Sequence, residues 1–184
     1  MKEQLRNRFG TARMGVCMAG LLAFASSSYG SNEATVVEQF ELKILANTLG
    51  GREIIAGEYI AAIEQIHSTP SLDSKYVRNT NLCAAYTARG EFTLAEVKCK
   101  AALRASRSLS TGLQNTNRAR VASKNDQAAA LNNLGVLNAL QGNKEEALKY
   151  FQSASNRSKD LRATTNQNIS VLEERTGSEV VASS

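Results

Sequence analysis

Residues 128–155 decide the fold, and they read AAALNNLGVLNALQGNKEEALKYFQSAS. Apolar residues recur here at the three- and four-residue spacing of a helix. The pattern stops at Gly142 and Asn143, two residues that favour turns, and then resumes as far as Ala154. The stretch therefore predicts two helices joined by a tight turn.

Two earlier segments repeat the spacing of this stretch. Gly142 follows Leu134 by 8 residues, and Ala147 follows it by 13. The same two spacings occur in two other sets: Leu82, Gly90 and Ala95; Leu49, Gly57 and Ala62. Three agreements on two spacings indicate a repeated helical hairpin. The turn glycine can adopt a positive φ and end the first helix without strain.

The pattern resembles the tetratricopeptide repeat (TPR), a helix–turn–helix unit of 34 residues. The resemblance implies an all-α fold, namely a right-handed α-solenoid of antiparallel helical hairpins whose first helices line a concave groove. It also implies a scaffold that binds a protein or peptide partner there. The repeats are degenerate, since Ala46, Asn79 and Leu131 replace the early tryptophan of the family and Cys99 replaces a bulky aromatic residue.

Small residues are expected where the two helices of each hairpin approach closely, with large residues filling the flanks. Gly50 would face Ala62 in the first unit, Cys83 would face Ala95 in the second, and Gly135 would face Ala147 in the third. The predicted repeat-packing residues are Leu49, Gly50, Ala62, Leu82, Cys83, Ala95, Leu134, Gly135, Ala147 and Phe151.

Residues 1–30 have the layout of a secretory signal peptide. A basic start is followed by twelve apolar or small residues, 14–25, and then by small residues that suit cleavage after Ala25 or Gly30. The apolar segment is shorter than the ~20 residues that a membrane span needs. The alternative is a buried N-terminal helix. The signal predicts an exported protein, periplasmic or secreted, without a transmembrane span in the mature chain.

Export changes what charge and cysteine content imply. The whole chain has a net charge of +5, but only 18 basic and 16 acidic residues follow residue 30, so nucleic-acid binding is not expected. The mature chain keeps Cys83 and Cys99, one on each helix of the middle hairpin. In an oxidising compartment they either form a disulfide or remain two small buried apolar side chains.

The chain is expected to form one helical domain over residues 31–177. Its expected helices span residues 35–49, 58–67, 74–89 and 91–107, the pair within 128–155, and a capping half-repeat over 159–177. The middle and last units lie 18 residues further apart than one repeat, which predicts an insertion loop near residues 108–124. Residues 178–184 are expected to be a flexible tail.

Two surfaces are candidates for partner binding. The first is the concave groove, whose uncharged lining suits an extended or helical peptide: Val77, Thr80, Ala84, Thr87, Asn132, Val136, Ala139 and Leu140. The second is a basic region without acidic residues between Val97 and Asn125, which would attract an anionic partner: Lys98, Lys100, Arg104, Arg107, Arg118, Arg120 and Lys124. The alternative for the second is a solvated face.

No catalytic, metal or cofactor motif is present in the sequence. The single histidine, His67, falls at a predicted helix end, where the helix dipole favours a cation. The sequence therefore predicts a protein-binding scaffold without enzyme activity, cofactor or metal. The alternatives are an envelope-surface adaptor acting through the basic region, a small hydrolase on a helical scaffold, and a chain that self-associates through an end face.

Overall fold

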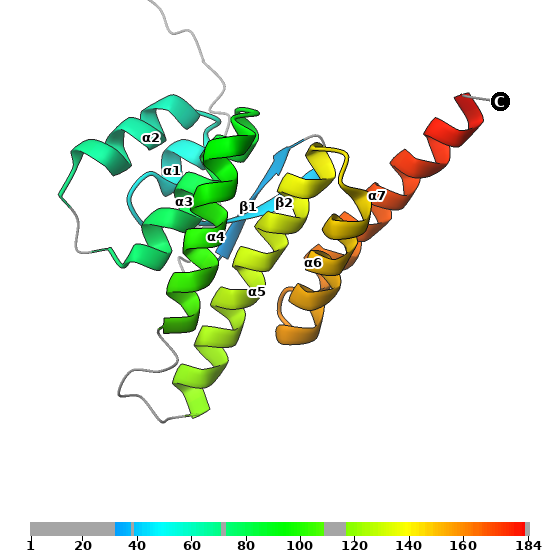
Figure 1. Cartoon of the computed structure of the whole chain (residues 1–184). Coiled ribbons are helices and arrows are strands. Elements are labelled where there is room, and N and C mark those ends of the chain that lie inside the picture. Colours follow the sequence, from blue (N-terminus) through cyan, green and yellow to red (C-terminus); the bar gives the residue numbers. More distant parts are fainter. Residues whose placement is uncertain (1–31, 38, 71–72, 109–116, 183–184) are drawn as a thin grey trace, which may run out of the picture.

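The computed structural model describes residues 32–37, 39–70, 73–108 and 117–182 (Figure 1). The described part of the chain is mostly helical, as expected, but its first elements form a β-hairpin. The elements in chain order are β1 (Asn32–Val37), β2 (Phe40–Leu45), α1 (Gly51–Ile55), α2 (Tyr59–Ser68), α3 (Lys75–Ala88), α4 (Phe92–Ser108), α5 (Asn117–Leu140), α6 (Lys144–Arg157) and α7 (Arg162–Ala182).

The turns between paired helices form as the glycine spacing predicts. Gly57 precedes α2, Gly90 lies between α3 and α4, and Gly142 lies between α5 and α6, with φ of 79°, 74° and 79°. Residues with a Cβ rarely adopt this left-handed conformation. Helix α3 also begins where a cap is available, because the Ser74 hydroxyl accepts a hydrogen bond from the Val77 N–H at 3.3 Å.

The helix expected over residues 35–49 is wrong. This stretch forms the antiparallel hairpin β1–β2, with Val37 paired to Phe40 and Asn32 paired to Leu45. Phe40, Leu42 and Ile44 alternate with Glu41 and Lys43, so the segment fits the two-residue period of a strand as well as a helical stripe. The contacts that β2 makes with distant helices decide between the two.

Two other boundaries differ from the expectation. Residues 117–124, expected in an insertion loop, are the first turns of α5, and residues 109–116 lie outside the described part. Helix α7 continues to Ala182, so residues 178–182 of the expected tail are helical. The predicted signal peptide also lies outside the described residues. Within those residues, no helix combines the length and apolar character that crossing a membrane requires.

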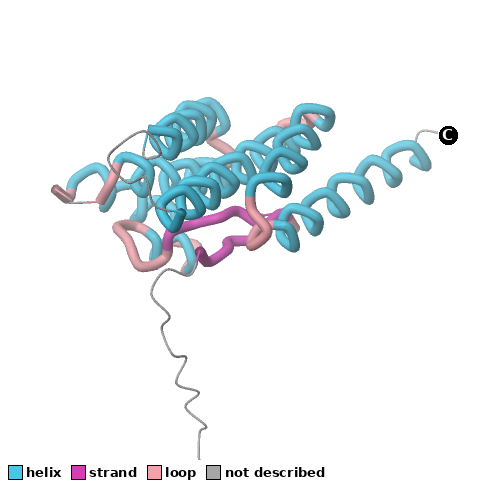
Figure 2. Tube along the Cα trace, turned by 90° about the horizontal axis from the view of Figure 1, so that it is seen from below, coloured by secondary structure: helices cyan, strands magenta, loops and turns pink. Residues whose placement is uncertain are grey.

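The hairpin lies on one side of the helical layer (Figure 2). Helices α3, α5 and α7 pack directly on β2, while α4 packs on α3 and α5, and α6 packs on α5 and α7. Phe40, Leu42 and Ile44 are fully buried in one core with residues of α3, α5, α6 and α7. The main core of the protein is thus formed between β2 and the helices.

The predicted repeat-packing residues lie in the interior, except that Leu49 is half-buried. Cys83 and Ala95 share a core with Leu82, and Ala147 and Phe151 share one with β2. The helices approach so closely at Gly135 that an added Cβ would lie 2.5 Å from the Phe151 ring. Gly50 is similarly confined, because a Cβ added there would lie 2.6 Å from the Ile66 side chain.

Replacing Gly135 with alanine tests this close approach. We expect Gly135→Ala to lower the free energy of unfolding by about 1–3 kcal/mol through overpacking, although alanine is the better helix former. Urea denaturation gives the change. The double variant Gly135→Ala, Phe151→Leu should recover part of the loss. Unchanged stability of the single variant would contradict the packing of α5 on α6.

Candidate functional site

Three asparagine side chains grip the main chain of β2. The Asn133 Oδ1 accepts from the Lys43 N–H at 2.7 Å, and its Nδ2 donates to the Lys43 carbonyl at 2.7 Å. Asn168 makes the same pair of bonds with Glu41, at 2.8 and 3.0 Å. Asn81 does so with Leu45, at 2.9 and 3.2 Å. We call Asn81, Asn133 and Asn168 the asparagine ladder.

The ladder contacts every second residue of β2, which follows from strand geometry. In a strand the N–H and C=O of alternate residues point to the same edge, so Glu41, Lys43 and Leu45 face the ladder. The main-chain groups of Phe40, Leu42 and Ile44 therefore face β1. Each carboxamide directs a donor and an acceptor at the strand, as a neighbouring strand would. The ladder thus takes the place of a third strand.

A second layer of side chains supports the end of the ladder at Glu41. The Asn132 Nδ2 also donates to the Glu41 carbonyl, at 2.8 Å, and the Asn132 Oδ1 accepts from Asn168 at 2.9 Å. Asn132, Asn133 and Asn168 are each fully buried. Buried polar groups are stabilising only when they are paired, and here each has a partner.

The apolar side chains of β2 occupy the space between the helices. Phe40 stacks on Phe151 with ring centroids 6.5 Å apart, and the Arg175 guanidinium lies 5.0 Å from the Phe40 centroid. Leu42 and Ile44 are completely buried in the same core. The site therefore recognises β2 twice, through its main chain at odd positions and through its side chains at even positions.

The structure places the predicted groove residues beneath this hairpin and not on an open surface. Thr80, Ala84, Thr87, Asn132 and Val136 are buried, and Val77, Ala139 and Leu140 are half-buried. Ala84 and Val136 share a core with Phe40, Leu42 and Ile44. The sequence pattern cannot reveal this, because it does not show that residues 40–45 fold back over helices that begin 30 or more residues later.

The hairpin turn is locally unfavourable. Two residues, Glu38 and Gln39, separate β1 from β2, and Gln39 has a φ of 77°. Two-residue hairpin turns favour asparagine and glycine, because a side chain at positive φ costs roughly 1–2 kcal/mol. The groove contacts of β2 therefore stabilise the hairpin more than its turn does.

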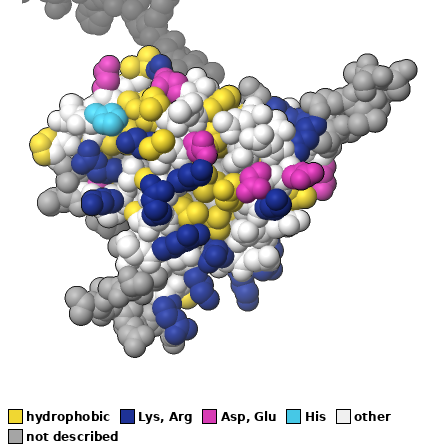
Figure 3. All heavy atoms as spheres, in the orientation of Figure 1, with side chains coloured by type: hydrophobic (Ala, Val, Ile, Leu, Met, Phe, Trp, Pro, Cys, Tyr) yellow, Lys and Arg dark blue, Asp and Glu magenta, His cyan; other side chains and the backbone are white. Residues whose placement is uncertain are grey.

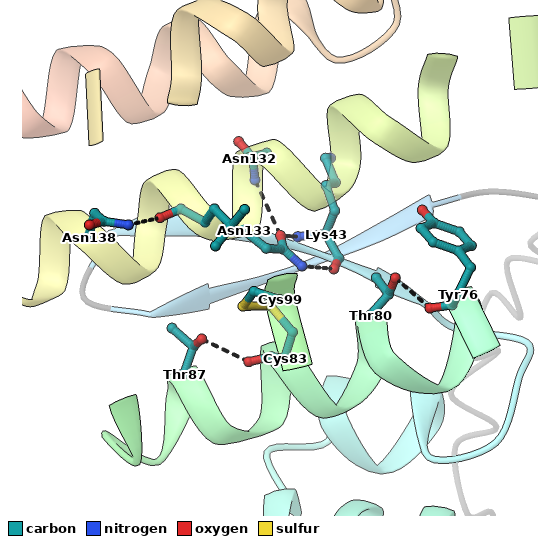
Figure 4. Close-up of a disulfide and its surroundings, with 10 residues drawn as sticks. Lys43, Tyr76, Thr80, Cys83, Thr87, Cys99, Asn132, Asn133 and Asn138 are labelled. Atoms are coloured by element: carbon teal, nitrogen blue, oxygen red, sulfur yellow. Dashed lines mark hydrogen bonds between the residues drawn. A yellow bond between two sulfur atoms is a disulfide. The ribbon is translucent and has the colours of Figure 1, made fainter. Parts of the chain in front are cut away.

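A disulfide joins α3 to α4. Cys83 of α3 and Cys99 of α4 are bonded, with their Cα atoms 4.8 Å apart (Figure 4). The sequence left open whether the two cysteines form a disulfide or remain separate buried side chains, and the structure has the disulfide. A loop of this size gains about 3 kcal/mol from closure. Figure 4 also shows Asn133 of α5 directed at the main chain of Lys43.

Burial perturbs three titratable groups near β2 and α3, namely Lys43, Tyr76 and Asp126. Burial lowers the pKa of Lys43, against the opposing effect of Glu41, whose carboxylate lies 3.8 Å away. Burial raises the pKa of the Asp126 carboxyl to about 6, and the Tyr76 hydroxyl opposes this shift. The pKa of Tyr76 is raised by burial and then by Asp126. Among the described residues no group has normal hydrogen-bond geometry with the Tyr76 hydroxyl.

The predicted basic residues are dispersed over α4 and the start of α5. Arg104, Arg107, Arg120 and Lys124 are exposed, and Lys98 is half-buried. Lys100 pairs with Glu96 on its own helix. The side chain of Arg118 lies outside the described residues. Figure 3 shows that Lys and Arg side chains surround hydrophobic ones on the face that carries α4 and α5.

His67 lies in the last turn of α2, and its Nε2 is 3.3 Å from the Tyr86 hydroxyl. Within the described part of the chain, no group of three or more His, Cys, Asp or Glu side chains could hold a metal ion.

Sequence reasoning missed Asn81, Asn133 and Asn168 as site residues. A signal was nevertheless present, since each of them directly precedes the repeat position held by Leu82, Leu134 and Ile169. An amide at this position in three successive repeats was visible, but its ligand was not.

Comparisons with protein-family models, with curated proteins and with solved structures find no match to this chain. The geometry of the site therefore carries its functional interpretation.

Removing one member tests the asparagine ladder. We expect Asn133→Ala to lower the free energy of unfolding by about 1–3 kcal/mol, because the Lys43 N–H and carbonyl both lose their partner. Asn138→Ala on the same helix is the control, since Asn138 donates within its own helix to Leu134, at 2.8 Å, and should change stability by less than about 0.5 kcal/mol. Equal losses of unfolding free energy in Asn133→Ala and Asn138→Ala, measured by urea denaturation, would contradict the stabilising role of the ladder.

The raised pKa of Asp126 predicts a pH dependence. The folded state favours the protonated carboxyl, so its contribution to stability is complete below the unfolded pKa of 3.8 and is lost as pH rises through about 6. Because the group is partly exposed, we expect a loss of about 1 kcal/mol. Asp126→Asn should abolish this difference between pH 4 and pH 7.5 in urea denaturation. A parallel pH dependence in both proteins would exclude the assignment.

Proposed function

We propose that the chain is an exported, TPR-like scaffold that binds an extended segment of a protein partner in its concave groove. The observation that carries the proposal is the asparagine ladder, which pairs with both main-chain groups of alternate residues of an extended strand. Main-chain pairing gives affinity for any strand, and side-chain pockets add specificity. The signal-like residues 1–30 and the disulfide support export.

The resident strand indicates the chemistry of such a partner. Positions equivalent to Phe40, Leu42 and Ile44 would be apolar, with an aromatic residue first, because Phe40 lies between Phe151 and Arg175. Positions equivalent to Glu41 and Lys43 would tolerate polar residues, because the ladder contacts only their main chain. The partner segment would therefore alternate between apolar and polar residues.

A partner segment would compete with the hairpin for the groove. The hairpin is tethered, and tethering by a short linker corresponds to an effective concentration on the order of millimolar. The strained residue Gln39 works against the hairpin and not against an incoming strand. Binding would therefore be set by the balance between hairpin closure and partner affinity.

The face of α4 is the second candidate for binding. Leu94 and Val97 are 45% and 55% exposed there, in line with Arg104 and Arg107 further along the helix. Exposed apolar groups beside cations suit an anionic surface, such as an acidic lipid headgroup layer. This is the envelope-surface adaptor, and its binding would weaken with salt.

Competition with a peptide of residues 39–46 tests the groove. Thr35→Pro removes a main-chain donor that faces Leu42 in β2, which loosens the hairpin without altering the groove. We expect it to strengthen binding of a labelled peptide about tenfold. Gln39→Gly relieves the turn and should weaken binding about fivefold. Fluorescence anisotropy measures both.

Two controls keep this experiment decisive. A peptide with aspartate at the positions of Phe40, Leu42 and Ile44 should not bind, and Asn133→Ala should weaken binding of the parent peptide. Failure of a folded Thr35→Pro variant to bind at all would refute the groove proposal. Binding of anionic vesicles that is lost in about 0.5 M salt would instead favour the α4 face, because salt shortens the Debye length and screens exposed charges.

A further inference from the structure

We propose that β1 pairs edge to edge with β1 of a second copy of this chain, which forms a two-fold symmetric dimer with a continuous four-stranded antiparallel sheet. This inference concerns the outer edge of the hairpin and does not depend on the proposed groove function.

The alternation of main-chain groups along β1 directs those of every second residue away from β2. The ladder takes the Glu41, Lys43 and Leu45 edge of β2, so Phe40, Leu42 and Ile44 pair with Val37, Thr35 and Glu33. The N–H and C=O groups of Asn32, Ala34 and Val36 consequently point away from β2. Within the described residues the sheet has two strands, so no strand pairs with this edge.

The position of the hairpin leaves its edge accessible to a partner. Figure 2 shows the hairpin on one side of the helical layer. In the described part, β1 makes its main contacts with β2 and α1. Helix α1 contacts both strands, and its residue Ile54 is buried with Phe40, Leu42 and Ile44. Helix α1 thus contributes Ile54 to the core face of the hairpin.

Strand β1 lacks proline, lysine and bulges, which commonly prevent edge pairing, and carries one charge, Glu33. Natural edge strands are protected by proline, lysine, bulges or short length. The segment Asn32–Val37 has six residues, NEATVV, with neither proline nor lysine, and its register with β2 is uninterrupted. The ladder fixes the β2 side of the hairpin.

Two copies of β1 can pair in one antiparallel register that matches all of their outward main-chain groups. Antiparallel pairing centred on Ala34 sets Ala34 opposite its own copy and Asn32 opposite Val36 of the second copy. All the outward main-chain groups are then paired. Glu33, the one charged residue of β1, lies opposite Thr35 and not opposite its own copy. A second copy therefore supplies a matching strand without like charges in direct opposition.

A contact of one strand edge buries little surface, so the dimer is expected to be weak and reversible. The test therefore uses the full chain over a wide concentration range, from about 1 to about 500 µM. Sedimentation equilibrium should show a monomer–dimer equilibrium. Ala34→Pro should weaken dimerisation about tenfold or more, because proline removes an outward donor while the pairing of β1 with β2 is kept. Ala34→Thr, which retains the donor, is the matched control and should dimerise as the parent does.

Cysteine cross-linking tests the register, in a background in which Cys17 is replaced by serine. Ala34→Cys should oxidise to a covalent dimer, because residues directly opposite in such a pair have Cα atoms ~5.5 Å apart. Thr35→Cys should remain uncrosslinked, since Thr35 faces Glu33 of the other copy. A chain that stays monomeric throughout, or a dimer unaffected by Ala34→Pro, would overturn the proposal.

Discussion

The structure depends on how the outer edge of β2 satisfies its main-chain groups. A strand buried against helices cannot leave its N–H and C=O groups unpaired, since each would cost roughly 1–3 kcal/mol. Asn81, Asn133 and Asn168 meet this requirement from three different helices. Each amide bonds to one particular residue of β2, so the ladder also fixes the position of the strand along its own axis relative to α3, α5 and α7.

The ladder couples helices that lie far apart in the sequence. Adjacent helical hairpins of a repeat protein normally contact only their neighbours. Here one strand touches α3, α5 and α7, and its side chains share a core with residues from α3 to α7. The disulfide adds a covalent link between α3 and α4. We therefore expect the domain to unfold as one unit and not repeat by repeat.

The same geometry gives the two proposals a common basis. The groove holds β2 because the amides bond to its main chain, while the apolar space between the helices accommodates its alternate side chains. The hairpin that fills the groove then presents a second edge, where Asn32, Ala34 and Val36 repeat the requirement that the ladder meets on the other side. Both proposals therefore rest on main-chain pairing, one at each edge of the sheet.

The sequence by itself determined the local structure of the helical hairpins. Glycines at a fixed distance from Leu82 and Leu134 predicted the turns, and small residues such as Ala95, Gly135 and Ala147 predicted the close helix contacts, because both effects act over a few residues. Only the tertiary structure decided the fate of residues 35–49. Phe40, Leu42 and Ile44 fit either period, and the choice depends on amides 36 to 127 residues away along the chain. Local propensity cannot report a hydrogen bond of that range, so the occupied groove and its ladder emerged only from the fold.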